Sequence, residues 1–248
     1  MEPSPTLDHP ETPESRSVID RVSDLLLAFD GSSAPLGLAE LSRRVNLPKA
    51  TVLRLARALA ARGLMQPENK GWRLGAEVGR LGAVYRRQAG LGGQIEPILR
   101  ALVRETGESA SFYIPTPQGR MCLHRVDSPQ AIREHVLEGD VLPFGRGAAG
   151  RVLLAFQTEA PDDPISASAR QNLLLTLVGD RDPMIAGVAA PVFGTCGLIG
   201  AITIAGPRPR FDGEALDRAG PIVRDAARTL TEALCGPVHM FDTIAEVA

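Results

Sequence analysis

The sequence predicts a mixed fold of two domains: a small, mainly α-helical domain with one β-hairpin, followed by a larger α+β domain. Apolar residues recur at helical spacing three times before residue 61, and two further apolar segments then flank a turn. Beyond residue 91, strand and helix patterns alternate without a regular strand–helix–strand rhythm, which favours an antiparallel sheet flanked by helices. The formal charge also changes, from +7 over residues 15–90 to −5 over residues 91–248.

The bulk composition is ordinary for a soluble globular protein, with 44% hydrophobic and 23% charged residues over 248 positions. No apolar run reaches the roughly 18 residues of a membrane-spanning helix, and the acidic, proline-rich start lacks the pattern of a signal peptide. The spacing of Cys122, Cys196 and Cys235 fits neither a disulfide framework nor a zinc site. We therefore expect a cytoplasmic protein with reduced thiols, no metal, no cofactor and no membrane partner.

The first helix is predicted to begin at Ser17. Residues 1–14 contain four prolines and four acidic residues, and we expect them to form a disordered arm. Ser17 and Asp20 then form an S-x-x-D start that is close to a capping box. The apolar residues that follow repeat at helical spacing as far as Phe29, and Asp30-Gly31 ends the helix.

The next two helices form the pattern of a helix-turn-helix. A short helix with Leu38, Leu41 and Val45 on one face stops at Asn46-Leu47-Pro48, and the proline begins a third helix. Five residues of the third helix make a core stripe: Val52, Leu55, Ala56, Leu59 and Ala60. Four residues lie off that stripe and make a mostly basic outer face suited to DNA: Lys49, Thr51, Arg54 and Arg57.

A β-hairpin is predicted directly after these helices. Leu64-Met65 and Trp72-Arg73-Leu74 flank the turn-rich segment 67–71. A hairpin in this position is a wing, and Lys70 and Arg73 are expected to reach the DNA backbone or minor groove. The alternative interpretation of the basic helix and hairpin is a solvated charged face.

Residues 75–91 are predicted to form a linker helix, although Gly75, Gly79 and Gly82 also allow a frayed linker. The α+β domain is expected over residues 92–236, with a tail over residues 237–248. Helices are expected at Ile95–Val103, Gly147–Gln157 and Arg170–Leu177, with a long last helix after Phe211-Asp212. Strands are expected at Ser109–Ile114, Arg120–Val126, Ile132–Val136, Ile185–Phe193 and Leu198–Ala205.

Taken together, these motifs resemble the IclR family of bacterial transcription regulators. In the first domain the resemblance lies in Ser17-Val18, in Leu38–Leu55 (L-A-E-L-S-R-R-V-N-L-P-K-A-T-V-L-R-L) and in Trp72-Arg73-Leu74-Gly75. In the second it lies in Glu105–Glu108, His124–Pro129, Leu142–Ala155, Val188–Val192 and Gly200–Pro207. It implies a winged helix-turn-helix over residues 15–74 and a GAF-like effector-binding domain over residues 92–236. It also implies a homodimer or tetramer, paired through the linker helix, on a near-palindromic site in double-stranded DNA.

The resemblance places the effector pocket at six positions: Gly147, Ala148, Ile185, Gly187, Thr203 and Ala205. A glycine-rich loop that enters a helix presents free N–H groups, which favour the carboxylate of a small organic acid, and Arg146 could add a charge-assisted bond. Gly187 and Ala205 stand where relatives carry bulkier or more polar residues, so we expect room for an acid with an apolar body. The alternative is that these small residues only pack the sheet.

Nothing in the sequence predicts catalysis. There is no H-E-x-x-H motif, no G-x-S-x-G elbow and no phosphate-binding loop of the P-loop type. Gly145, Gly147 and Gly150 spell G-x-G-x-x-G, but no dinucleotide-binding strand follows, and prolines flank Asp162-Asp163. We therefore predict a DNA-binding regulator that is not an enzyme. The alternative is an enzyme or a protein-interaction module whose winged helix does not bind DNA.

Overall fold

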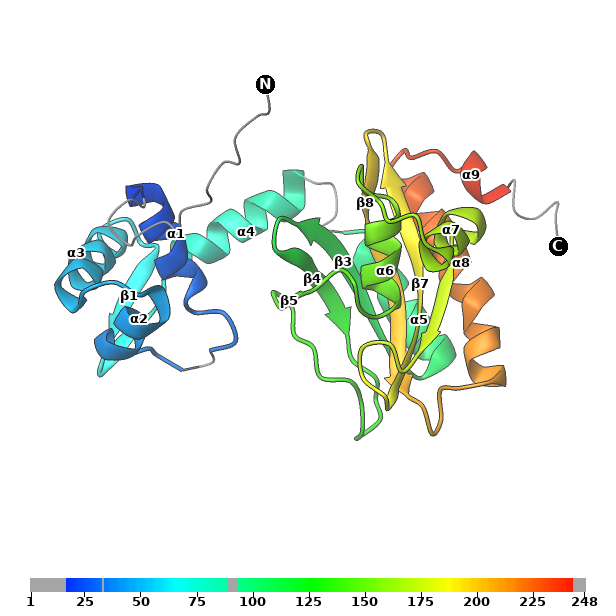
Figure 1. The fold of residues 1–248 in the computed structure, drawn as a ribbon, viewed down its shortest axis with the longest axis horizontal. Helices are drawn as coiled ribbons and strands as arrows, with labels where there is room; N and C mark the ends of the chain where they lie inside the picture. Colours follow the sequence, from blue (N-terminus) through cyan, green and yellow to red (C-terminus); the bar gives the residue numbers. More distant parts are fainter. Residues whose placement is uncertain (1–16, 33, 89–92, 243–248) are drawn as a thin grey trace, which may run out of the picture. The chain divides into compact units, whose positions relative to one another are not determined.

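The computed structural model describes residues 17–32, 34–88 and 93–242, and the chain divides into two compact units, Met1–Arg87 and Gln88–Ala248 (Figure 1). The first unit contains three helices, α1 (Val18–Leu27), α2 (Leu38–Val45) and α3 (Lys49–Ala60). An antiparallel hairpin of β1 (Met65–Glu68) and β2 (Gly71–Leu74) follows, and then α4 (Ala76–Gln88). This order confirms the predicted helix-turn-helix with its wing.

Local sequence signals determine where the helices of the first unit begin and end. The Ser17 side chain accepts the Asp20 N–H, and the Asp20 carboxylate accepts the Ser17 N–H, so the capping box is complete. The α2 helix ends at Asn46, which adopts the left-handed conformation at φ 51°. The hairpin is held to the segment before α2 because Leu36 and Trp72 exchange two backbone hydrogen bonds of 2.8 and 2.9 Å.

The second unit is built on a six-stranded antiparallel sheet in the order β5-β4-β3-β8-β7-β6. Its strands are β3 (Ser109–Thr116), β4 (Gly119–Val126), β5 (Val141–Leu142), β6 (Leu175–Val178), β7 (Ile185–Gly194) and β8 (Gly197–Pro207). Its helices are α5 (Ile95–Thr106), α6 (Ala148–Ala155), α7 (Pro164–Asn172), α8 (Glu214–Ala233) and α9 (His239–Asp242).

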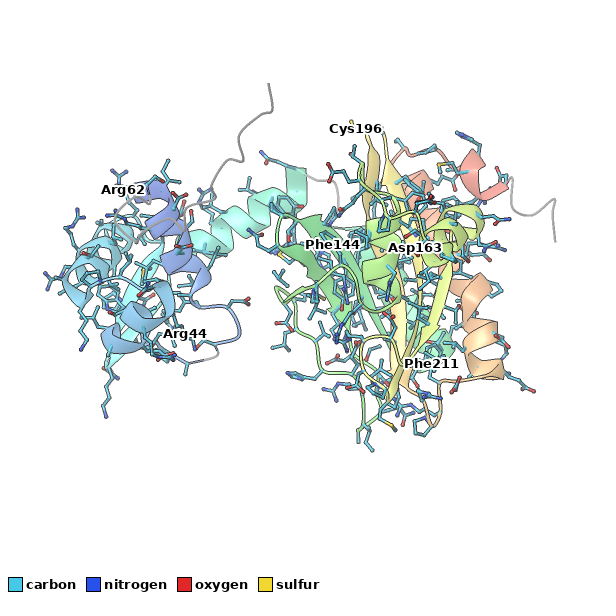
Figure 2. All side chains as sticks on the ribbon, in the orientation of Figure 1. Arg44, Arg62, Phe144, Asp163, Cys196 and Phe211 are labelled. Atoms are coloured by element: carbon cyan, nitrogen blue, oxygen red, sulfur yellow. The ribbon has the colours of Figure 1, made fainter. Side chains whose placement is uncertain are left out.

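Helices cover both faces of this sheet. The α5 and α8 helices pack on one face over an apolar cluster that includes Phe112 and Ile202, and α6 packs on the other over a second cluster. Phe211 belongs to the first cluster, and Phe144 packs against the second; both side chains are labelled in Figure 2. Because helices bury both faces of the sheet, its central strands β7 and β8 contain long apolar runs.

Side chains alternate between the two faces of the sheet along β7 and β8, its two longest strands, and this alternation places small residues at the candidate site. Val188 of β7 and Ile204 of β8 point toward α5 and α8 and are fully buried there. The residues between such positions point to the opposite face, toward α6. Gly187 pairs with Ala205 and Ala189 pairs with Thr203, so small residues from both strands gather under the beginning of α6.

Three segments of the second unit differ from the sequence-based expectation. Residues 132–136 form no strand, and β4 pairs with β3 on one side and with the short strand β5 on the other. The helix expected at Arg170–Leu177 ends at Asn172, because Leu173 turns left-handed at φ 47° and β6 begins at Leu175. Ordered structure also continues past residue 236, where the ring of Phe241 in α9 is buried 6.4 Å from that of Phe193.

The linker helix expected over residues 75–91 is α4, and the arm expected over residues 1–14 lies outside the described residues. Within the described part of the chain, no helix combines the length and hydropathy that crossing a membrane requires. The same residues contain no group of three or more histidine, cysteine or acidic side chains placed to hold a metal ion.

Candidate functional site

The outer face of α3 carries basic side chains that are not neutralised. Lys49, Arg54 and Arg57 are exposed, Thr51 is partly exposed, and none of the three cations forms an ion pair with a described residue. On α2, by contrast, Glu40 binds both Arg43 and Arg44, at 2.6 and 2.8 Å. The structure therefore leaves the positive charges of these three side chains exposed on α3 and available to a polyanion.

The two basic residues predicted on the wing differ in their surroundings. Lys70 is exposed at the turn between β1 and β2 and has no acidic partner among the described residues. Arg73 pairs with Glu68 across the hairpin at 3.3 Å. Both of these side chains are largely exposed, so water screens their attraction and the pair can open at little cost.

Six of the seven predicted effector residues line one pocket of the second unit. Its lining includes Gly147, Ala148, Ile185, Gly187, Thr203 and Ala205. The Thr203 hydroxyl donates to the Val188 carbonyl at 2.6 Å, so part of its hydrogen-bonding capacity is used within the sheet. The cavity has a volume of about 40 Å³, which is room for one or a few water molecules.

Arg146 is not among the residues that line the pocket. It is exposed on the loop before α6, whereas the predicted fork required it to reach the ligand. Four charged residues that the sequence analysis did not consider line the cavity instead: Arg120, Glu134, Asp180 and Arg181. The pocket therefore differs from the roomy, apolar one expected from Gly187 and Ala205.

The beginning of α6 is held by Asp180. Its carboxylate accepts the Gly147 N–H at 2.6 Å and binds the Arg151 guanidinium at 2.8 Å. Burial opposes ionisation of this carboxyl, but Arg151 and the Gly147 N–H outweigh that cost, so the pKa of Asp180 lies below its usual value. Gly147 adopts φ 74°, a left-handed conformation that suits glycine and lets the loop turn into the helix.

Arg120 of β4 is buried in the same pocket, with 3% of its surface exposed. One terminal nitrogen, Nη1, donates to the Pro143 carbonyl, and the guanidinium lies over the Tyr113 ring, 5.2 Å from its centroid. Burial lowers the pKa of Arg120, but an arginine side chain remains charged at neutral pH. Its Nε is buried and has no hydrogen-bond partner.

The other charged residues of the pocket are paired. Arg181 forms an ion pair with Glu134, which also lies 3.5 Å from the Arg125 guanidinium. Only a weak sequence signal existed for Arg120, which is a charged residue just before the apolar segment 121–123 of β4. Which face of the sheet it occupies depends on the register of β4, and that register is a long-range property.

Two family models match successive segments of the chain. The IclR helix-turn-helix domain matches residues 18–68, and the bacterial transcriptional regulator IclR C-terminal domain matches residues 85–172. The chain belongs to the IclR family of bacterial transcription regulators. Its members regulate transcription and are not enzymes, which confirms the prediction against catalysis.

IclR-family relatives match along most of the chain. The HTH-type transcriptional regulator BhcR of Paracoccus denitrificans is 27% identical over 240 residues, which cover 86% of this chain and 85% of BhcR. The HTH-type transcriptional repressor AllR of Escherichia coli K12 is 22% identical over 256 residues, which cover 93% of this chain and 94% of AllR.

Solved structures of IclR-type regulators share the fold. One from Silicibacter sp. TM1040 superposes with a TM-score of 0.77 at 24% identity and covers 88% of this chain and 96% of its own. An IclR homologue from Microbacterium hydrocarbonoxydans, crystallised with 4-hydroxybenzoate, gives a TM-score of 0.72 at 20% identity over 88% of this chain and 99% of its own. At these identities the likeness concerns the fold alone, and the bound acid belongs to the Microbacterium protein.

Proposed function

We propose that this IclR-family protein binds a near-palindromic operator in double-stranded DNA as a homodimer or a tetramer, and that a small organic acid bound in the second unit controls its affinity for DNA. The observation that carries the DNA-binding part is that Lys49, Arg54 and Arg57 of α3 are exposed and form no ion pair with a described residue. Operators lie in the cytoplasm of a bacterium, so the proposal places the protein there.

In this proposal α3 enters the major groove and the wing contacts the flanking backbone. Arg54 and Arg57 lie one turn apart on the outer face of α3, and Lys49 and Thr51 occupy its first turn, where helix-turn-helix proteins contact base edges and phosphates. Lys70 and Arg73 of the hairpin extend the same positive surface. Arginine suits both partners, because its planar fork matches phosphate oxygens and the guanine edge.

Pairing of two protomers through α4 is part of the proposal. No residue of α4 is buried, and Leu81 and Tyr85 are 48% and 44% exposed. A Cβ atom added at Gly79 would meet nothing within 4 Å, so a second helix could approach closely there. An exposed apolar face flanked by glycine is suited to helix pairing.

The effector part rests on the pocket under α6. Six of its lining residues were expected on the basis of family resemblance, and a relative of the same fold binds an organic acid. The first amides of a helix lack intrahelical partners and favour an anion. The described cavity of about 40 Å³ must widen to admit an acid of that size, so ligand binding and a change in this domain are coupled.

A fluorescence anisotropy titration with labelled DNA from the region flanking the gene tests both parts. We expect the purified full chain to bind one segment tightly, and a panel of organic acids to shift that affinity. The Arg100→Ala variant is a control that should bind DNA like the wild type, because Arg100 is an exposed arginine of the second unit, outside the proposed DNA-binding surface. Failure to bind any flanking segment more tightly than random DNA would refute the regulator proposal.

A further inference from the structure

The pocket under α6 contains a buried cation that forms no salt bridge with any residue the structure describes. Among the charged residues that line it, Arg181 is paired with Glu134, and Asp180 is paired with Arg151. Arg120 has no carboxylate partner among the described residues, although only 3% of its surface is exposed. Burying a charge without a partner is costly, so a buried arginine of this kind requires an explanation.

The free part of the Arg120 guanidinium has the geometry of a carboxylate fork. Nη1 is used by the Pro143 carbonyl. Nε has no partner, and neither Nε nor Nη2 donates to any described residue. These two nitrogens form one edge of the planar group, and that edge can give two parallel hydrogen bonds to the two oxygens of one carboxylate.

The beginning of α6 adds a second positive feature at the same point. Arg120 lies close to this helix start, since its Nη2 would be 3.4 Å from a Cβ atom at Gly147. The N-terminus of a helix carries partial positive charge, which disfavours a guanidinium there. The Asp180 carboxylate at this helix start and Glu134 attract Arg120, but neither forms a salt bridge with it. The Gly147 N–H is already bound by Asp180, whereas the amides of Ala148 and Ala149 have no acceptor among the described residues.

Two glycines of the G-x-G-x-x-G motif provide the space for this guanidinium. A Cβ atom at Gly150 would collide with Nη1 and Cζ of Arg120 and with the Phe144 carbonyl. At Gly147 any side chain would be strained by the positive φ and would lie beside Nη2 and Arg181. The motif that resembles a dinucleotide fingerprint is thereby explained by the packing of an arginine against a helix.

We infer that Arg120 binds the carboxylate of the effector through Nε and Nη2, with the first free amides of α6 on the other side of the anion. This inference rests on the proposed function, because it assumes that an organic acid occupies this pocket. It assigns to a buried strand residue the role that the sequence had suggested for Arg146. The fork requires a ligand with an ionised carboxylate, which offers two acceptor oxygens. The matching amide offers only one acceptor oxygen and should bind poorly.

Calorimetric titration of the full chain tests the inference with matched acid and amide pairs, namely pyruvate with pyruvamide and 4-hydroxybenzoate with 4-hydroxybenzamide. We expect an acid to bind and its amide to bind at least tenfold more weakly. Arg120→Lys keeps the charge but loses the fork. The affinity of this variant for the acid should therefore fall by roughly ten- to a hundredfold, the range expected for charge-assisted bonds. Arg146→Ala, a matched change of an exposed arginine, should bind like the wild type.

A measurement on the wild type tests the same inference if the Arg120→Lys variant fails to fold. In a protein labelled with ¹⁵N-arginine, the Nε resonance of Arg120 should shift when the acid is added and should not shift with the amide. Equal acid affinity in wild type and a folded Arg120→Lys variant, or an unmoved Nε resonance at saturation, would overturn the assignment of Arg120 while leaving acid control intact. If none of the acids binds the wild type or alters its operator affinity, acid control itself is rejected, and the role of Arg120 with it.

Discussion

At the scale of single residues, the two units use arginine in opposite ways. On α3 the arginines are exposed and have no ion-pair partner in the described part of the chain, which suits contact with a polyanion in solvent. In the second unit Arg120 is buried beneath a helix start, where the low polarity strengthens its interactions and makes it selective for an anion. In our proposals the same side chain therefore supports a screened, long-range attraction in one domain and a short-range fork in the other.

Arg54 provides a residue-scale prediction for DNA recognition. Arg54→Ala should weaken operator binding by roughly ten- to a hundredfold if the side chain reads a base, and should leave the melting temperature nearly unchanged because Arg54 is exposed. Anisotropy titrations on the operator and on a scrambled sequence measure both affinities. An equal loss on the two sequences would indicate a phosphate contact, and no loss on either would remove Arg54 from the interface.

Asp180 provides a residue-scale prediction with a defined dependence on pH. Its pKa is lowered in the folded protein, so the stabilisation it gives is present above the unfolded pKa of about 4 and is lost as the pH falls through the folded value. Asp180→Asn loses the Arg151 pair and should cost about 1–3 kcal/mol of unfolding free energy at pH 7.

Chemical denaturation of the two proteins at pH 7 and at pH 3 measures this difference, which should shrink at the lower pH. Glu214→Gln is a suitable control, because Glu214 is exposed and pairs with Arg218 only at 3.4 Å, so little change is expected. A stability difference that stays constant between the two pH values would contradict the assigned role of the Asp180 carboxylate.

At the scale of elements, local patterns predicted the first unit better than the second. The α1–α3 helices and the hairpin follow from apolar spacing, a capping box and turn residues, all of which act within a few positions. In the second unit the apolar run Leu173–Leu175 does not distinguish helix from strand by its pattern, and the chain changes from α7 to β6 there. Residues 132–136 were expected to form a strand but form none; three polar residues separate Ile132 from Val136, and Ile132 is 73% exposed.

Local sequence patterns also predicted only part of the pocket. Positions on β7, β8 and α6 were predicted through the family resemblance, and the antiparallel register that pairs Gly187 with Ala205 brings them to one face. Arg120, Glu134 and Arg181 come from β4 and from two loops distant in sequence. Their meeting depends on the order of strands in the sheet, which no local pattern records.

The position of the wing relative to DNA can be tested with Trp72, the single tryptophan of the chain. It lies on β2, opposite Pro67, one residue from Arg73 and two from Lys70. If the hairpin contacts DNA, operator binding should change the emission of Trp72, and the acid alone should change it less. Fluorescence titration measures this directly, and unchanged emission at saturation with a verified operator would show that the wing stays away from DNA.

At the scale of the whole molecule, the division of charge indicates which unit meets DNA. Residues 1–14, 15–90 and 91–248 carry net charges of −4, +7 and −5, so the total of −2 conceals a strongly basic segment, residues 15–90, within the first unit. A polyanion attracts the first unit and repels the second. Binding to DNA should therefore depend steeply on salt even though the whole protein is weakly acidic.

The last prediction concerns the paired protein on its operator. A dimer presents two α3 helices, which require half-sites about one helical turn apart, and doubles the phosphate contacts that Arg54, Arg57, Lys70 and Arg73 supply. With 6–10 such contacts, affinity should fall by roughly 10³- to 10⁵-fold between about 50 and 200 mM salt. Anisotropy titrations across that range give the slope, and sedimentation of the complex gives the number of protomers bound. Insertion of about five base pairs between the half-sites should abolish tight binding, because it turns one recognition surface to the opposite side of the duplex. Tight binding that survives both high salt and the insertion, or a complex with a single protomer, would rule out this mode of recognition.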